Sequence, residues 1–273
     1  MTTTRKYTEY APKGLIGVLT PQANTTVEPE MAMLCPPGFA IINARMVSDK
    51  AHMGDRLSDY LENIDAEIDQ FANAPVNTLA LAVTGPSYLI GPARERTLVE
   101  RIEATRGVPL VTTAQAVCDA LHILEARTID LLSPYPPSLT EKSQAYWMAQ
   151  GYRIGETIAL QGDDDSFHPI YAMSSQSAGI AIKEMQESAA DAIVMLGTGL
   201  PTLRPMAAYS GWRGPPVLSC LFCLAWRAVQ AATGRSLDLR GLRQWQSSQH
   251  WRWRLPPEKG NRRVYPTSDL SRS

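Results

Sequence analysis

The chain has 273 residues, and its 26 Lys and Arg against 27 Asp and Glu give a formal net charge of −1 at pH 7. That balance argues against a dedicated nucleic-acid binder, and no apolar run reaches the ~20 residues that a membrane span requires. The first 13 residues lack the apolar segment of a signal peptide and predict a flexible arm, so we expect a cytoplasmic globular protein.

Short apolar runs recur along the chain, and several are apolar on both faces, as parallel strands are when helices cover both sides of their sheet. The predicted strands are 14–21, 39–46, 78–85, 109–113, 128–135, 153–160, 192–199 and 215–220. Segments of helical periodicity lie between them. The predicted helices are 57–73, 93–106, 112–126, 137–151 and 174–190. This alternation predicts an α/β fold with mainly parallel sheets.

Two short motifs repeat at nearly the same distance. "VLTPQ" and "LLSPY" place Pro21 and Pro134 at equivalent points, 113 residues apart, and "LAVTG" and "MLGTG" place Thr84 and Thr198 114 residues apart. Such a repeat predicts two pseudo-symmetric α/β halves. All four motifs end predicted strands, where parallel sheets bind their ligands, so we expect the active site in the cleft between the halves.

The expected organisation has four parts. They are an arm at 1–13, a first half at 14–110 plus 215–234, a second half at 111–214, and a basic extension with tryptophans at 235–273.

The segment after the first strand supplies Pro21, Gln22, Asn24 and Thr25 as candidate substrate contacts. Asn24 offers an amide donor and Thr25 a hydroxyl group. Both residue types also serve as turn and N-cap residues, and the sequence leaves the two interpretations open.

Two glycine-containing loops, "TGPS" and "GTGLP", can direct backbone N–H groups and hydroxyl groups at an anion. The same donors would stabilise an oxyanion or enediolate. The candidates in these loops are Val83, Thr84, Gly85, Ser87, Gly197, Thr198 and Gly199.

Tyr135 stands between two prolines in "SPYPPS". Its phenol can bind a carboxylate or act as a weak general acid, so we take Tyr135 and Thr84 as candidate catalytic residues. An ordinary buried tyrosine is the alternative.

The motifs "GLIGVLTPQANTTVEPE", "ALAVTGPSYLIG", "LLSPYPPSLT", "AIVMLGTGLPTL" and "PPVLSCLFCLAW" follow one another in the order and spacing of a known family. Over residues 14–234 the chain resembles the aspartate/glutamate racemase superfamily, in the branch of maleate isomerase and arylmalonate decarboxylase. The resemblance implies two pseudo-symmetric halves, no metal and no organic cofactor. It also implies that Asn24, Thr84, Tyr135 and the Thr198 loop hold a substrate carboxylate.

The chain departs from that family at its cysteines. The resemblance implies one cysteine in each glycine-containing loop of the isomerases and racemases, and those positions fall on Val83 and Gly197 here. A maleate isomerase needs a thiolate and a two-base racemase needs two proton carriers. Decarboxylation needs only an apolar slot, oxyanion donors and one proton source. We therefore expect a lyase-type reaction on a small carboxylic acid, with a non-cysteine isomerase or racemase and a catalytically silent carboxylate binder as alternatives.

His168 follows a predicted strand and titrates near neutrality, which makes it the candidate proton carrier. A loop histidine paired with the aspartates at 163–165 is the alternative. His122 lies in a predicted helix and is expected to be structural, whereas His52 could line the cleft. Arg45 could bind a second carboxylate, although a surface ion pair is the simpler expectation.

Four cysteines are too few and too scattered for a disulfide framework. "CLFC", with Cys220 and Cys223, has the spacing of a redox pair or half a zinc site, but its apolar neighbours favour buried core cysteines.

The extension from 235 carries nine Lys or Arg against three Asp or Glu, with Trp245, Trp251 and Trp253 interspersed. Basic and aromatic residues together can stack on nucleic acid. We expect instead that this segment folds back over its own domain or over a partner subunit in a homo-oligomer. The substrate and the oligomeric state are not fixed by the sequence.

Overall fold

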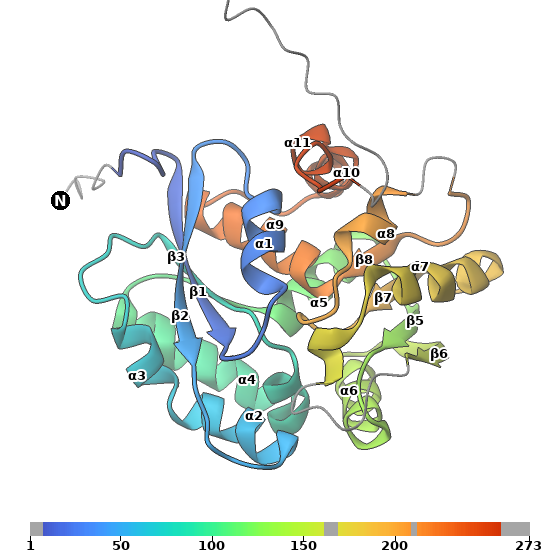
Figure 1. Ribbon diagram of the computed structural model, residues 1–273, viewed down its shortest axis with the longest axis horizontal. Coiled ribbons are helices and arrows are strands. Elements are labelled where there is room, and N and C mark those ends of the chain that lie inside the picture. Colours follow the sequence, from blue (N-terminus) through green and yellow to red (C-terminus); the bar gives the residue numbers. More distant parts are fainter. Residues whose placement is uncertain (1–7, 161–168, 209–211, 258–273) are drawn as a thin grey trace, which may run out of the picture.

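The computed structural model describes residues 8–160, 169–208 and 212–257. It contains two parallel four-stranded sheets with the corresponding orders β2-β1-β3-β4 and β6-β5-β7-β8 (Figure 1). The strands of the first sheet are β1 (Gly14–Pro21), β2 (Phe39–Met46), β3 (Thr78–Leu81) and β4 (Leu110–Thr112). Those of the second are β5 (Thr128–Ser133), β6 (Arg153–Ala159), β7 (Ala192–Met195) and β8 (Val217–Ser219).

The repeat predicted from the sequence is present in the fold. β5 begins 114 residues after β1, and β7 begins 114 residues after β3, so each central pair of strands has its counterpart in the other sheet. The predicted α/β fold with two pseudo-symmetric halves is thereby confirmed. β3, β5 and β7 end earlier than predicted, because the residues after them leave the sheet to form loops at its carboxyl edge.

The expected division of the chain differs from the sheet pairing at two strands. β4 pairs with β3 in the first sheet, although residues 111–112 were expected in the second half. β8 pairs with β7, so the strand predicted within 215–220 belongs to the second sheet rather than the first. The helix that follows it, α9 (Cys220–Thr233), contacts β1, β3 and β4 of the first sheet. Ten residues of α9 are buried, because its apolar faces meet both halves at once.

The helices depart from the predicted bounds where local backbone geometry interrupts the periodicity. The helix predicted at 57–73 is two helices, which meet at Asn63. The helix predicted at 93–106 already begins at Gly85 and is kinked at Gly91, where φ is 76° and Pro92 follows. The described helices are α1 (Val27–Leu34), α2 (Met53–Glu62), α3 (Ile64–Asp69), α4 (Gly85–Arg106), α5 (Thr113–Ile123), α6 (Pro137–Ala149), α7 (Ser175–Glu184), α8 (Leu203–Ala207), α9, α10 (Leu239–Ser247) and α11 (Gln249–Arg252), with 3-10 turns at Pro169–Ala172 and Met185–Glu187.

Two helix pairs pack closely together, and the second of them joins the halves. α5 packs on α9, and α4 packs on α6, and these are the most extensive helix–helix contacts in the described chain. Within the described residues, no helix combines the length and the apolar character needed to cross a bilayer.

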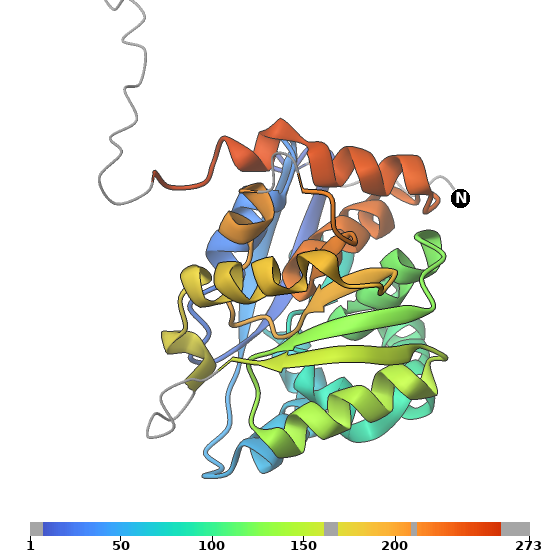
Figure 2. The same cartoon turned by 90° about the vertical axis from the view of Figure 1, so that its right-hand side faces the viewer.

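The C-terminal extension folds back as expected. α11 contacts α1, α10 contacts α5, and both lie on the opposite side of the molecule from α6 (Figure 2). Trp245 and Trp251 are buried, whereas Trp253 is 70% exposed. Cys220 and Cys223 are buried, as the sequence predicted, although they do open a helix, and Cys35 and Cys118 are buried as well.

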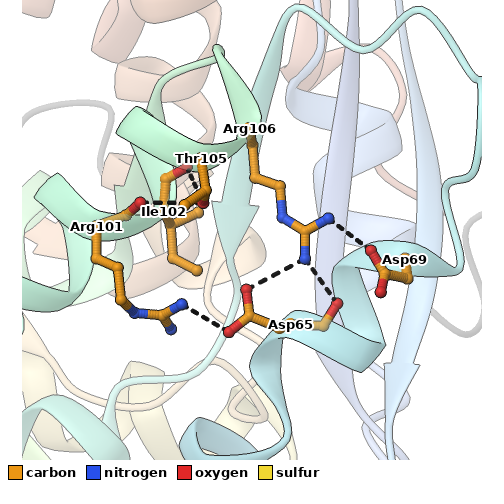
Figure 3. Close-up of polar contacts among 6 residues, drawn as sticks. All are labelled: Asp65, Asp69, Arg101, Ile102, Thr105 and Arg106. Atoms are coloured by element: carbon orange, nitrogen blue, oxygen red, sulfur yellow. Dashed lines mark hydrogen bonds and ion pairs between the residues drawn. The ribbon is translucent and has the colours of Figure 1, made fainter.

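Exposed ion pairs connect α3 to α4 (Figure 3). Arg106 contacts Asp69 at 2.5 Å and Asp65 at 3.1 Å, and Arg101 contacts Asp65 at 2.6 Å. Pairs so open to water contribute little each, up to about 1 kcal/mol, so they orient α3 more than they stabilise the fold.

Candidate active site

A cavity of about 740 Å³ lies where the carboxyl ends of the two sheets face each other. Its walls come from the end of β1, the segment into α2, the β3–α4 turn, the β5–α6 turn, the 3-10 turn at Pro169–Ala172 and the loop after β7. The predicted residues that line it are Pro21, Val83, Thr84, Gly85, Tyr135, Thr198 and Gly199.

Thr84 and Tyr135 meet across the two halves. Thr84 Oγ1 lies 2.8 Å from the Tyr135 hydroxyl oxygen, within hydrogen-bond distance. Thr84 directly precedes α4. Tyr135 is the second residue after β5, and Pro134 and Pro136 on either side restrict its backbone. Burial raises the pKa of Tyr135 well above its usual range, so the phenol stays protonated and can donate a hydrogen bond to an anion.

Asn24 follows the turn and capping interpretation, and it does not line the cavity. Its side-chain Oδ1 accepts hydrogen bonds from the backbone N–H groups of Thr26 (2.9 Å) and Val27 (3.1 Å), which caps the start of α1. Its Nδ2 group donates to Thr198 Oγ1 at 3.4 Å, and Thr198 in turn donates to the Ala82 carbonyl at 2.8 Å. Asn24 therefore fixes the Thr198 loop against the first half.

Five predicted contacts among the described residues do not line the cavity, and Asn24 and Gly197 are two of them. Ser87 donates to Glu95 at 2.7 Å, and Gln22 accepts from the Ser48 backbone at 2.6 Å, so both side chains bond elsewhere. Thr25 is exposed on the surface and lies outside the cavity wall. Gln22 and Thr25 lie in a turn after β1 as predicted, whereas Ser87 lies in the first turn of α4 and not in a loop. The direction of each side chain depends on its tertiary neighbours.

Gly197 adopts a left-handed backbone with φ at 85°, which a residue with a side chain rarely adopts. A Cβ atom there would lie 3.3 Å from the Tyr135 hydroxyl and 2.7 Å from Ile170 Cδ1. The glycine thus lets the loop after β7 approach Tyr135.

The histidine and Arg45 expectations have mixed outcomes. His168 lies outside the described residues. His52 lines the cavity, and His122 is exposed on α5. Arg45 forms an ion pair with Glu28 and donates to the backbone carbonyls of Pro21 and Asn24, each at 3.1 Å, so it braces the loop after β1.

The sequence reasoning missed the α2 wall of the cavity, which includes Arg56 and Tyr60. The sequence did contain a signal for this wall, because Arg56 occurs at the same helical spacing as Met53 and Tyr60. The sequence analysis also treated Cys220 only as a core residue and did not place it next to the candidate site. Its buried thiol interacts with the Thr84 side chain and the Gly197 backbone, directly behind the Thr84–Tyr135 pair, and burial raises the pKa of this thiol to about 12.

The charge of the cavity wall favours an anion. Arg56 is its one permanently charged side chain among the described lining residues, and no Asp or Glu joins it there. The described part of the chain also holds no cluster of three or more His, Cys, Asp or Glu side chains that could bind a metal ion.

Two repeated parallel-sheet halves with a hydroxyl-lined cavity between their carboxyl edges define a class of α/β enzymes. The family model described as arylmalonate decarboxylase matches residues 16–241, and the chain belongs to this family.

Curated relatives support the assignment. The maleate isomerase of Pseudomonas putida (strain KT2440) is 25% identical over 230 residues, covering 79% of this chain and 90% of the relative. The maleate isomerase of Nocardia farcinica is 28% identical over 237 residues, covering 82% and 90%. The chain is accordingly an enzyme of the lyase or isomerase type.

Solved structures show the same fold. The maleate isomerase Iso from Pseudomonas putida S16 superposes with a TM-score of 0.73 at 23% identity, covering 84% of this chain and 96% of the other. A crystal structure of arylmalonate decarboxylase gives 0.66 at 19% identity with the same coverage.

Proposed function

We propose that this enzyme acts on a small carboxylic acid through an enediolate or oxyanion stabilised by Thr84 and Tyr135, in a decarboxylase-like reaction. The observation that carries the proposal is the pair of hydroxyl groups at 2.8 Å in a cavity whose described wall contains no cysteine. Donors held in place by the two halves stabilise charge that develops on the substrate carboxylate, without having to reorganise during the reaction.

The missing thiol favours this chemistry over thiolate addition. A variant of the Nocardia farcinica maleate cis-trans isomerase carries a covalently bound succinylcysteine intermediate. We infer that Val83 and Gly197 occupy the two positions where enzymes of that kind have cysteines. All four cysteines of this chain are buried, and none lines the cavity.

In the proposed reaction the C–C bond to the leaving carboxylate breaks, CO₂ departs, and its bonding electrons pass into the enediolate. One proton then returns to the α-carbon. His168 remains our candidate for that proton transfer, and Tyr135 is the candidate among the described residues, since its phenol lies at the cavity.

The test uses phenylmalonate and maleate as substrates. We expect CO₂ release from phenylmalonate. Tyr135→Phe and Thr84→Val should each lower kcat by roughly 10- to 1000-fold, as loss of one oxyanion donor does, with a smaller change in binding.

An isomerase reading is favoured if maleate is converted to its trans isomer while no CO₂ appears. If the parent binds carboxylates but shows neither reaction nor α-proton exchange in deuterated water, the enzymatic proposal fails and the chain is a carboxylate binder.

A further inference from the structure

The loop after β7, at residues 197–202, belongs to the second half, but several of its hydrogen bonds lead to the first half. Thr26 Oγ1, directly before α1, donates to the Gly199 carbonyl at 2.8 Å, and Asn24 Nδ2 donates to Thr198 Oγ1 at 3.4 Å. Thr198 and Gly199 both line the cavity. The place of this cavity wall therefore depends on contacts across the junction between the halves.

Glu30 of α1 binds the far end of the same loop. Its side chain is buried, and Oε1 accepts hydrogen bonds from the backbone N–H groups of Thr202 at 2.7 Å and Leu203 at 3.1 Å. Its Oε2 atom lies 3.2 Å from Thr202 Oγ1, which in turn lies 2.8 Å from Ser219 Oγ at the end of β8. One carboxyl group of the first half thus holds three polar groups of the second half in place.

The surroundings of Glu30 favour its protonated form. Burial raises its pKa to about 7, while the hydrogen bonds from Thr202 and Leu203 oppose that rise. The charged and titratable groups that the neighbouring elements present here interact with other partners, and they are Glu28, Arg45, Arg204, Cys220, His250 and Arg254. Ionisation of Glu30 therefore leaves a buried negative charge that only hydrogen bonds from the second half compensate.

Docking of the loop is consequently linked to pH. When the loop leaves α1, Glu30 becomes hydrated and its pKa returns to the ordinary value of 4.5, whereas in the docked loop it is about 7. The docked state has the higher pKa, so its advantage is complete below about pH 4.5 and is lost as the pH rises through about 7. The two backbone N–H groups keep their acceptor in both forms, so ionisation weakens docking without abolishing it.

We propose that Glu30 is a positioning residue, which holds the loop at 197–202 from the opposite half so that Thr198 and Gly199 complete the cavity beside Tyr135. The catalytic part of this inference rests on the proposed function, whereas loop docking is measurable without turnover. Glu30 does not line the cavity, so its role is exerted through the loop. A displaced loop disturbs the groups around the reacting atoms, and small displacements of such groups lower kcat steeply.

The kinetic test compares two substitutions of the same residue. Glu30→Met removes both oxygen acceptors, whereas Glu30→Gln keeps one acceptor for the two backbone N–H groups. We expect Glu30→Met to lower kcat for CO₂ release from phenylmalonate by roughly 10- to 100-fold, and Glu30→Gln to stay within about 3-fold of the parent. Glu103→Met is the matched control, because Glu103 accepts from the Leu110 backbone at 3.0 Å within the first half and outside the cavity. It should leave kcat within about 3-fold.

Backbone hydrogen exchange measures docking directly, at the loop amides 197–200, which precede the two amides that Glu30 binds. After correction for the intrinsic exchange rate, the opening equilibrium of these amides in the parent should rise by about 10-fold between pH 6 and pH 8, because the open loop has the lower Glu30 pKa. Glu30→Gln should show no such rise. Glu30→Met should open at least about 10-fold more than the parent at pH 6.

Several results would overturn the inference. They are equal kcat losses in Glu30→Met and Glu30→Gln, a more open loop with unchanged kcat in Glu30→Met, or a pH-dependent rise that the amides of β5 share equally, which shows a change of global stability alone. If Glu30→Met does not fold, the exchange curves of parent and Glu30→Gln decide, and parallel curves refute the role of Glu30. If the parent shows no turnover, the proposed function and the catalytic part fail, while the exchange data still decide whether Glu30 docks the loop.

Discussion

The sequence around Thr84 gives only a weak indication of a functional residue, and the structure strengthens it by placing Thr84 beside Tyr135. A threonine before a helix is commonly a cap, yet no side-chain cap bond forms here, and its hydroxyl group points instead to the phenol of the other half. Gly197 lets the loop after β7 lie against this pair, because a Cβ atom at that position would be only 3.3 Å from the Tyr135 hydroxyl oxygen. Three ordinary residue types thus build the end of the cavity where we propose that an oxyanion binds.

Cys220 is the residue on which a hidden thiol mechanism would depend. Burial raises the pKa of its thiol to about 12, so almost no thiolate exists at neutral pH. We expect Cys220→Ala to keep kcat within about 10-fold of the parent, while stability falls by about 1 kcal/mol through lost packing. Steady-state kinetics and urea unfolding measure the two effects.

Cys223→Ala is the matched control, because Cys223 lies one turn later on α9 and is equally buried. A kcat loss above about 100-fold for Cys220→Ala alone, with folding preserved, would show that the thiol takes part in the chemistry.

Among the elements, α1 illustrates how the halves are joined close to the active site. Its Glu30 is buried and accepts from the backbone N–H groups of Thr202 at 2.7 Å and Leu203 at 3.1 Å, both in the second half. Thr202 Oγ1 donates to the other carboxyl oxygen at 3.2 Å. Burial raises the pKa of Glu30 to about 7, although the three hydrogen bonds oppose that rise.

This pKa predicts how stability depends on pH. Folding favours the protonated form of Glu30, so its contribution is complete below about pH 4.5 and is lost as the pH rises through about 7. The rise in the pKa of Glu30 from 4.5 to about 7 corresponds to a change of about 3 kcal/mol at most in the unfolding free energy. We expect the unfolding free energy of the parent to fall between pH 5 and pH 8 by more than that of Glu30→Gln, measured by urea unfolding at each pH.

Glu30→Gln suits this comparison because its single carbonyl oxygen can accept both backbone N–H groups, while its NH₂ group faces the Thr202 hydroxyl group. Parallel pH curves for parent and variant would contradict a titrating Glu30.

For the molecule as a whole, the C-terminal helices act as a cover over α1 and α9, away from the cavity. Trp251 is completely buried, its Nε1 group donates to the Trp245 carbonyl at 3.0 Å, and its ring meets Phe222 of α9. No residue of α10 or α11 lines the cavity, so we expect this cover to stabilise the fold.

Trp251→Ala should lower the unfolding free energy by about 3 to 5 kcal/mol, as removal of a buried tryptophan does, and leave carboxylate affinity unchanged. Trp253→Ala, at a 70% exposed position, should change stability by less than about 0.5 kcal/mol. Thermal unfolding with and without phenylmalonate measures both. Equal losses from the two variants would refute the proposed role of Trp251.

The sequence by itself determined the elements whose signal is local. The runs 14–21 and 39–46 are strands with the predicted bounds. The first is buried throughout, and a buried parallel strand must be apolar on both faces. The repeated motifs likewise predicted the two halves, and with them Thr84, Tyr135 and Thr198 at one cavity. Backbone turns and strand ends are encoded close to where they occur.

Only the tertiary structure decided which side chains face the cavity and which sheet β8 joins. Ser87 shows the reason, because its hydroxyl group turns to the buried Glu95, which no local pattern favours. β8 pairs with β7 because that edge of the second sheet is open to it, which no local pattern records. Side-chain direction and strand partners depend on residues far apart in the chain, so they are settled when the halves pack together.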